Sequence, residues 1–390
     1  MRQDPGILIV GGGPVGTTLA LALQTKGIAV TLLEAREKGA SHQDQRALAL
    51  SYGSRLILER LGLWAGLAPQ ATAINTIHIS QRGSFGRTLL QAKDHGQEAL
   101  GYVVAYGALC KALDSALSNF NHIQVIYGAE ATAIQPAHDL AAVIFNQAGN
   151  EQILRHPLVV LADGGRSLGD TPGLNRETRE YGHDALVTKV QCELAHDNIA
   201  YERFTPAGPV ALLPNGERDF SLVWTGKREE VQELLGLKED EFLASLHTHF
   251  GDRVGRFLNV SKRLSFPLKL SYLNPVTAPH LVVIGNAAQT MHPVAGQGFN
   301  VGLRDAWELA DIIAATAPAA WGFDAMLKTY QISRKVDTRH GLLFTDFLVK
   351  TFSNDIVGLS KLRGAGLGLL DIVQPAKKRL VSKMSFGAQG

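Results

Sequence analysis

Cysteine, excess charge and long apolar runs are all scarce in this chain of 390 residues. Its two cysteines, Cys110 and Cys192, belong to no CxxC pair and no Cys/His cluster, so we expect neither a disulfide framework nor a zinc site. Lysine and arginine total 38 against 36 aspartates and glutamates. This balance gives no general attraction for a polyanion, and we expect no nucleic-acid partner and no metal.

The hydropathy of the chain predicts neither a membrane span nor a signal peptide. The longest apolar runs fall short of the ~18–20 residues that cross a bilayer. The first six residues lead directly into a short strand, without the apolar core of a signal peptide. Together with the scarce cysteine, these features predict a cytoplasmic protein.

Charge is nevertheless distributed unevenly along the chain. Residues 335–390 hold nine Lys or Arg and four Asp or Glu, so this segment carries +5 and the rest of the chain −3. Its densest basic cluster is Lys377, Lys378 and Arg379. Two interpretations stay open, namely solvated helices that close the fold and a peripheral contact with an anionic membrane.

Glycine is abundant, at 40 residues, and the first cluster of glycines ends an apolar strand. Ile7–Val10 runs into three consecutive glycines, and residues 14–26 then show helical spacing. Gly11, Gly13 and Gly16 match the G-x-G-x-x-G dinucleotide fingerprint, in which the helix N-terminus faces a pyrophosphate.

The residues that follow support the same interpretation. Pro14 occupies the first helical position, where proline is favoured. A second expected strand, Ile28–Leu33, leads into Glu34, 18 residues after Gly16. A carboxylate at this strand end accepts hydrogen bonds from a ribose 2′-hydroxyl. The βαβ unit therefore predicts a site for the adenosine half of a dinucleotide.

A second motif places Asp163 before two glycines, directly after the apolar strand 157–161. Because glycines leave space around it, this carboxylate can reach a ligand hydroxyl or an arginine. An ordinary Asp-Gly turn is the alternative.

The third motif is the longest of the three. An expected strand, 280–284, is followed by a glycine-rich loop and by a helix over 298–316. The backbone N–H groups of such a loop and helix start point to one place, which suits an anionic ring. The motif contains Gly285, Asn286, His292, Pro293, Gly296, Gln297, Gly298 and Asn300.

Between the second and third motifs the pattern changes to strands separated by Gly, Pro and Asn turns, at 185–192, 210–214 and 220–224. We expect an α/β fold in which a Rossmann-type domain is interleaved with a sheet-rich substrate domain and followed by C-terminal helices. The expected boundaries are 1–72, 98–171 and 270–335 for the first domain, 73–97 and 172–269 for the second, and 336–390 for the helical segment.

Together, the three motifs resemble the FAD-dependent aromatic hydroxylases, the class A flavoprotein monooxygenases, across essentially the whole chain. The resemblance implies FAD as the resident cofactor and NAD(P)H as the co-substrate, with reduced flavin and dioxygen hydroxylating an electron-rich phenol. Arg46, within the segment 44–50, resembles an arginine that reaches FAD in this family. An arginine on a solvated loop is the alternative.

The resemblance also implies roles for individual residues. His292, Pro293 and Gly296 would lie beside the reacting ring, where His292 is either a proton relay or a packed loop residue. The cofactor-binding residues would be Gly11, Gly13, Pro14, Gly16, Glu34, Arg46, Asp163, Gly285, Asn286, Gly296, Gln297, Gly298 and Asn300.

Closer still is the ubiquinone-biosynthesis branch of this family, which includes hydroxylases of 2-polyprenyl-6-methoxyphenol. Asn286 stands where most of the wider family has an aspartate, and asparagine is typical of the branch. Ala105 replaces a glutamate common in the branch. The segments that carry the resemblance are Ile74–Ser80, Glu202–Thr205, Gly208–Pro209, Leu213–Pro214 and Gly285–Asn300.

The branch implies a polyprenylated phenol as substrate, contacts with other ubiquinone-biosynthesis proteins, and a peripheral membrane position through the basic C-terminal segment. Rival functions stay open. An FAD hydroxylase of another aromatic compound shares every motif. A polyprenyl reductase would consume no dioxygen, and a noncatalytic assembly subunit would show no substrate-stimulated NAD(P)H oxidation. In the sheet-rich domain, Arg203, Phe204 and Trp224 are either packing residues or a substrate wall.

Overall fold

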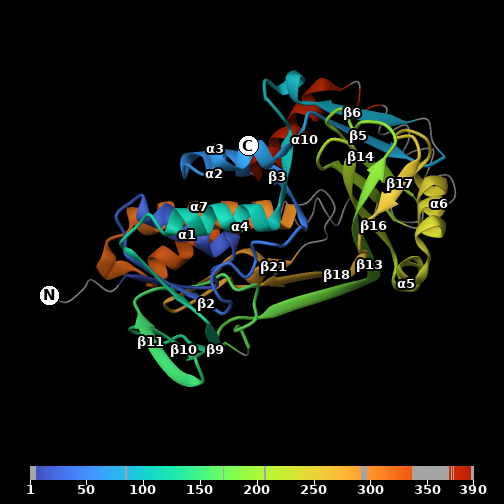
Figure 1. Cartoon of the computed structure of the whole chain (residues 1–390). Coiled ribbons are helices and arrows are strands. Elements are labelled where there is room, and N and C mark those ends of the chain that lie inside the picture. Colours follow the sequence, from blue (N-terminus) through green and yellow to red (C-terminus); the bar gives the residue numbers. More distant parts are fainter. Residues whose placement is uncertain are drawn as a thin grey trace.

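The computed structural model describes residues 6–83, 86–169, 171–205, 208–290, 297–335, 369, 371 and 373–387. Figure 1 shows a helix-rich half that carries the N-terminus and a sheet-rich half with helices α5 and α6 at its far side. Two long strands, β13 (Arg176–Cys192) and β18 (Leu264–Leu273), pair antiparallel and run between the halves.

A six-stranded sheet forms the centre of the helix-rich half. Every neighbouring pair in it is parallel except the pair made by the edge strand β19. This arrangement confirms the expected Rossmann-type α/β fold. In spatial order the strands are β19 (Thr277–Ala278), β20 (Leu281–Val283), β12 (Val159–Leu161), β1 (Ile7–Val10), β2 (Val30–Glu34) and β8 (Ile123–Tyr127).

Both faces of this sheet are buried, which explains why its strands read as continuous apolar runs. Ile7 and Ile9 belong to a core that they share with several helices, and Leu8 and Val10 belong to a second core on the other face. Among these helices are α1 (Pro14–Gln24), α4 (Tyr106–Leu117) and α7 (Gln297–Ala315). A small antiparallel sheet of β9 (Ala129–Gln135), β10 (Ala141–Gln147) and β11 (Asn150–His156) covers the second core.

A larger sheet forms the other half of the molecule, and we propose the domain boundaries given above for the two halves. Helices α5 (Arg228–Gly236) and α6 (Glu239–Phe250) bury one of its faces, here called the outer face, over a core that includes Leu186, Leu212 and Trp224. In order the strands are β21 (Gln289–Thr290), β18, β13, β16 (Asp219–Lys227), β15 (Val210–Pro214), β14 (Ile199–Phe204), β5 (Thr76–Gln81) and β6 (Arg87–Gln91), and β17 (Phe257–Val260) pairs with β13.

The opposite face of the large sheet, here called the inner face, is turned toward the helix-rich half. There Ala200 of β14 packs with Ile74 and Val103 of a three-stranded sheet, and Val381 of α10 packs with Leu90. The elements on this side are β3 (Ala47–Ser51), β7 (Gly101–Ala105), β4 (Thr72–Ile74) and α10 (Gln374–Phe386).

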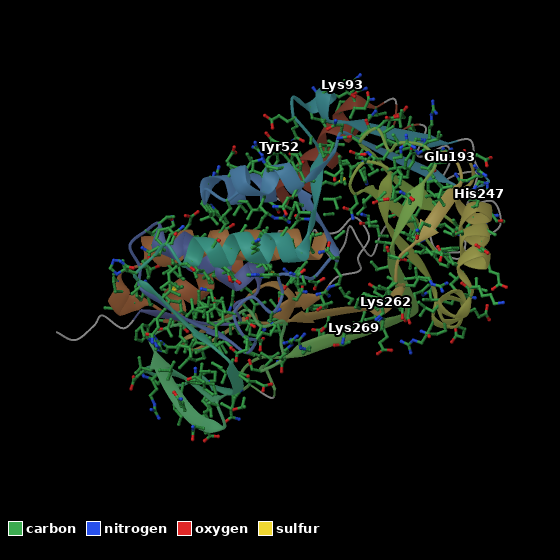
Figure 2. The ribbon with its side chains drawn as sticks, in the orientation of Figure 1. Tyr52, Lys93, Glu193, His247, Lys262 and Lys269 are labelled. Atoms are coloured by element: carbon green, nitrogen blue, oxygen red, sulfur yellow. The ribbon has the colours of Figure 1, made fainter. Side chains whose placement is uncertain are left out.

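Helix α10 also contacts the helix-rich half. Tyr52, labelled in Figure 2, begins α2 (Tyr52–Arg60), and its ring meets that of Phe386 edge-on at 6.2 Å between centroids. Three residues before the helix begins, Asp371 accepts a hydrogen bond from the backbone N–H of Leu89 on the edge strand β6 (3.0 Å). The C-terminal helix therefore contacts both halves of the molecule.

Several expected elements have different ends in the structure; the strand expected over 185–192, for example, is the end of the longer β13. In two cases a glycine turn that closes a helix explains the difference. β2 begins at Val30 instead of residue 28, since the N–H of Ile28 donates to Leu23 at the end of α1. Residues 53–64 also have a helical pattern in the sequence, but α2 ends at Arg60, because the N–H of Leu63 donates back to Leu58. The remaining short elements are α3 (Trp64–Leu67), η1 (Ala68–Gln70), η2 (Ala92–His95), η3 (Gly285–Ala287), η5 (Pro318–Ala320) and a helix over 324–335.

Across the described ranges, no helix has both the length and the apolarity that a bilayer span requires. In the same ranges, no group of three or more His, Cys, Asp or Glu side chains is placed to hold a metal ion.

Candidate cofactor site

The three sequence motifs meet because they follow three neighbouring strands of the parallel sheet. β1, β12 and β20 are adjacent and parallel, and each leads into one motif at its carboxyl end. The carboxyl edge of a parallel sheet is where ligands bind in folds of this class. Motifs that are more than 100 residues apart in the chain therefore form one candidate site.

In the first motif, Gly13 stands in an extended conformation (φ −69°, ψ 174°) immediately before α1. With Pro14 as the first helical residue and no side chain capping the helix, the first N–H groups of α1 are available to a ligand. A Cβ added to Gly13 would have no protein atom within 4 Å. This open position beside a helix N-terminus fits a pyrophosphate.

The other two fingerprint glycines serve close packing. A Cβ on Gly16 would lie 2.0 Å from the carbonyl oxygen of Gly11, and a Cβ on Gly11 would lie 2.6 Å from the Cα of Asp163. Helix α1 and the second motif can therefore approach β1 only because these positions carry no side chain.

Glu34 ends β2 with its side chain directed at the glycine turn. The residue is 8% exposed, and Oε2 accepts a hydrogen bond from the N–H of Gly12 (2.7 Å). Oε1 accepts from the backbone N–H and the Nε of Arg36 (2.9 and 2.6 Å), and this carboxylate raises the pKa of the Arg36 guanidinium. Glu34 is thus fixed beside the start of α1, and its contact with a ribose stays a prediction. Sequence reasoning did not single out Arg36.

Asp163 uses its carboxylate on its own loop. It accepts hydrogen bonds from the N–H of Gly165 (2.8 Å) and from the N–H and hydroxyl of Ser167 (2.8 and 2.5 Å). These bonds hold the glycine loop against Gly11. A further contact of Asp163 with a ligand stays a prediction.

A buried ion pair holds the third motif in place. Asp305 of α7 accepts hydrogen bonds from the backbone N–H of Gly285 (3.0 Å) and from the Nε2 of Gln289 (3.3 Å). Its other oxygen pairs with Arg334 at 2.7 Å, and the two residues are 2% and 4% exposed. Arg334 is 29 residues from Asp305, and no local pattern marks the pair in the sequence.

Asn286 and Asn300 have different surroundings. Asn286 is exposed, and its Oδ1 lies 4.0 Å from the position that a Cβ of Gly298 would take, at the start of α7. Asn300 is buried, its oxygen accepts from the N–H of Ser51 and the hydroxyl of Ser54 (2.8 and 2.7 Å), and its amide donates to Ala49 (2.9 Å). The side chain of Asn300 thus joins α7 to β3 and α2, and its contact with the cofactor stays a prediction.

The remaining predicted residues lie at the margin of this arrangement. Arg46 precedes β3, pairs with Asp44 (2.6 Å) and lies over the ring of Tyr106, with its Cζ 5.2 Å from the centroid. Gln297 begins α7. Three predicted residues, His292, Pro293 and Gly296, lie outside the described residues.

Arg203, Phe204 and Trp224, the residues considered as a substrate wall, do not all lie on one face of the large sheet. Trp224 belongs to the core under α6, where its ring lies 4.8 Å from that of His249. Arg203 neighbours Glu202 and Phe204 in β14, so its side chain points to the opposite face from theirs. Burial and the nearby Arg82 and Arg203 lower the pKa of His249 to about 4. Trp224 is therefore a packing residue of the core on the outer face.

We expect Asn286→Ala to weaken FAD binding by ~1–2 kcal/mol, the usual consequence of removing one partner of a hydrogen bond. Asn286→Asp should be tolerated, because a carboxylate keeps the accepting oxygen at the same place. Fluorescence titration of the apoprotein with FAD measures both. A large loss with Asp and none with Ala would contradict a role of Asn286 in holding the cofactor.

Comparison with known proteins agrees with this geometry. The chain matches the FAD-binding domain family over residues 5–340. A ubiquinone hydroxylase of Rhodospirillum rubrum is 35% identical over 387 residues, which cover 98% of this chain and 89% of that protein. The 3-demethoxyubiquinol 3-hydroxylase of Escherichia coli is 30% identical over 375 residues, 94% of each chain.

Solved structures share the fold at lower identity. A p-nitrophenol 4-monooxygenase of Pseudomonas putida superposes with a TM-score of 0.79 at 16% identity, covering 99% of this chain and 98% of that one. A probable FAD-dependent monooxygenase of Pseudomonas aeruginosa gives 0.76 at 21% identity, over 94% and 99% of the two chains. The cofactor is FAD, and NAD(P)H is the co-substrate typical of the family. The chain is therefore an FAD-dependent monooxygenase and belongs to the family that contains the ubiquinone hydroxylases.

Proposed function

We propose that this monooxygenase hydroxylates the aromatic ring of a polyprenylated phenol in ubiquinone biosynthesis, with 2-polyprenyl-6-methoxyphenol as its substrate. The observation that carries the proposal is its 35% and 30% identity to two ubiquinone-pathway hydroxylases over 98% and 94% of the chain. When bound, FAD supplies the chemistry, accepting electrons from NAD(P)H and activating dioxygen. The protein binds and orients the substrate and the cofactor, and it excludes water from them.

For the cofactor we propose three contacts. The pyrophosphate lies at Gly13 and the open N-terminus of α1, which supplies N–H groups and a favourable dipole. The ribose lies at Glu34. The ribityl chain and the ring would be held by residues of the third motif, with Arg46 and Asp163 as further contacts. The residues of the motif are Asn286, His292, Pro293, Gly296, Gln297 and Gly298.

Two measurements test the substrate. Mass spectrometry of cells that lack the gene should show a polyprenylated phenol one hydroxylation short of the next intermediate. The purified protein should take up dioxygen when 2-prenyl-6-methoxyphenol and NAD(P)H are present together. NAD(P)H oxidation without oxygen uptake would point to a reductase instead, and activity only on unprenylated phenols would point to another aromatic substrate.

We also propose a cytoplasmic protein that contacts membranes and other ubiquinone-biosynthesis proteins peripherally, which would give access to a polyprenyl tail. The three basic residues 377–379 are not equally suited to test a membrane contact. Lys377 is 5% exposed and pairs with Asp371 (3.0 Å), whereas Lys378 and Arg379 are exposed. Only the latter two are suited to an anionic surface.

We therefore expect Lys378→Gln with Arg379→Gln to weaken binding to vesicles that contain anionic phosphatidylserine by about 30-fold, at ~1 kcal/mol for each cation. The matched control removes two exposed lysines elsewhere, Lys111→Gln with Lys328→Gln. Co-sedimentation at increasing salt measures both proteins. Equal losses in the two variants, or equal binding to neutral vesicles, would count against a membrane role for α10.

A further inference from the structure

One row of side chains crosses five strands of the large sheet. In the ladder, Val187 is paired with Val223, Val223 with Ala211, Ala211 with Glu202, and Glu202 with Ile79. Residues paired in this way point to the same face of a sheet. The five side chains therefore form one line, here called the Glu202 row, and all five are half-buried.

The Glu202 row lies on the inner face. The residues that alternate with it, among them Leu186, Leu212 and Leu222, are buried in the outer core under α5 and α6. Two positions before Glu202, Ala200 shares its face and packs in one core with Val103 of β7 and against Ala47 of β3. Since Arg46 directly precedes β3, the row is turned toward the half of the molecule that contains the cofactor site.

Glu202 is the one ionisable residue among these five positions, and the other four are apolar. The same line of the ladder continues to Leu264 of β18 at one end and to Thr88 of β6, which carries a hydroxyl, at the other. The described residues give the carboxylate of Glu202 no hydrogen bond and no ion pair, and the half-buried side chain keeps some access to solvent. Burial raises its pKa to about 7, and burial is the one cause of this shift. A carboxyl group that lies among apolar side chains and has no partner in the described residues is a candidate for contact with a bound ligand.

Of the charged groups that share this side of the sheet, those nearest the row in the ladder are paired, while Lys227 at the end of β16 is exposed and in no ion pair with a described residue. Lys189 of β13 pairs with Asp219 of β16 (2.6 Å), and Arg46 pairs with Asp44. Ile79 packs against α10, whose cations are Lys377, Lys378, Arg379 and Lys383 and whose Lys377 is paired with Asp371. On the flanking strands β5 and β15, the residues on this face are Ile77, Ile79, Gln81, Ala211 and Leu213.

We infer that Glu202 accepts the phenolic proton of the substrate while the apolar residues of its row hold the aromatic ring. This inference rests on the proposed function. The O–H bond of the phenol breaks, the proton passes to a carboxylate oxygen of Glu202, and the bonding electron pair stays on the phenolate oxygen. The phenolate is the more electron-rich form of the ring, which favours hydroxylation. An apolar row with a single acceptor matches a phenol that carries one hydroxyl and an apolar tail.

The test is Glu202→Gln, which preserves shape and a hydrogen-bond acceptor but removes the base. The matched control is Glu233→Gln, a change of the same kind at an exposed position of α5. Dioxygen uptake with 2-geranyl-6-methoxyphenol and NAD(P)H is followed from pH 5.5 to 9. For the unaltered protein and the control, kcat/KM should rise through pH 7 to a plateau. Glu202→Gln should lose this rise and ~10²–10⁴-fold in kcat, with KM changed little.

A stability measurement separates this role from a structural one. Because the folded pKa is above the unfolded value, the ionised side chain weakens the fold increasingly as pH rises from about 4.5 to 7. Glu202→Gln should therefore raise the Tm at pH 8.5 relative to the unaltered protein, and hardly at all at pH 4.5. A catalytic loss accompanied by a lower Tm or by lost FAD would overturn the inference.

The remaining outcomes are equally decisive. If Glu202→Gln keeps the turnover and the pH profile of Glu233→Gln, Glu202 is not the base. If the unaltered protein takes up no dioxygen with any prenylated phenol, the proposed function fails and the inference fails with it. Normal turnover by the unaltered protein together with an unchanged Glu202→Gln variant refutes the inference alone.

Discussion

Gly13→Val is expected to give a folded protein that purifies colourless, with FAD affinity reduced by more than about 100-fold. The physical reason is that a side chain at this position would meet no protein atom but would occupy the space proposed for the ligand. An added Cβ would meet no protein atom within 4 Å, and the extended backbone is one that valine adopts readily. The branched side chain would instead occupy the space before α1 that the pyrophosphate needs.

The measurements are the flavin absorbance of the purified protein and the Tm with and without added FAD. Added FAD should raise the Tm of the unaltered apoprotein, because a ligand that binds only the folded state stabilises it, and should leave that of Gly13→Val unchanged. Gly66→Val is the matched control, since its Cβ also meets nothing within 4 Å, but it lies in α3. A Gly13→Val protein that purifies yellow would contradict the proposal that the pyrophosphate of FAD binds at Gly13.

Arg334→Met is expected to lower the free energy of unfolding by ~3–5 kcal/mol, the usual effect of leaving one partner of a buried ion pair unpaired. Asp305 would then be an uncompensated carboxylate at 2% exposure. The damage should extend to the cofactor, since Asp305 holds the N–H of Gly285 at the start of the third motif.

Urea unfolding measures the loss in the free energy of unfolding. Two further variants show whether the ion pair is its cause. Lys328→Met, which breaks an exposed pair with Asp324 (3.5 Å), should change stability by less than about 0.5 kcal/mol. Adding Asp305→Asn to Arg334→Met should recover part of the loss, because the neutral amide still accepts a hydrogen bond from Gly285 without a buried charge. No recovery would mean that Arg334 acts through contacts other than the ion pair.

Local patterns were sufficient to predict the parallel sheet and the three motifs. The strand Ile7–Val10 and the glycines after it carry their own signal, because apolar runs, turn residues and helix starts are all properties of short segments. The same holds for residues 123–127, whose apolar and aromatic side chains predict a strand with the bounds that β8 has in the structure. The third motif, which is long and specific, indicated the resemblance to the FAD-dependent hydroxylases.

Interactions between distant segments could not be predicted in this way. Asp305 and Arg334 meet only after two helices have packed, and Asn300 reaches Ser51 across 249 residues. Lys377 reads as one of three basic surface residues in the sequence, yet its position against Asp371 buries it. The orientation of Glu202 depends on the register of three strands, so its place on the inner face follows only from the structure.

The order of strands in the parallel sheet also constrains when the protein can fold during its synthesis. β12 is complete at Leu161, but its neighbour β20 ends at Val283, after most of the large sheet has been made. At ~5–20 residues per second, a ribosome needs roughly 6–24 s to make the chain between them. During that time the edge of β12 that will pair with β20 has no partner strand, and an unpaired strand edge favours aggregation. The proposed FAD site is complete only once synthesis has passed Asn300 of the 390 residues, so we expect the cofactor to be captured late in translation or after release.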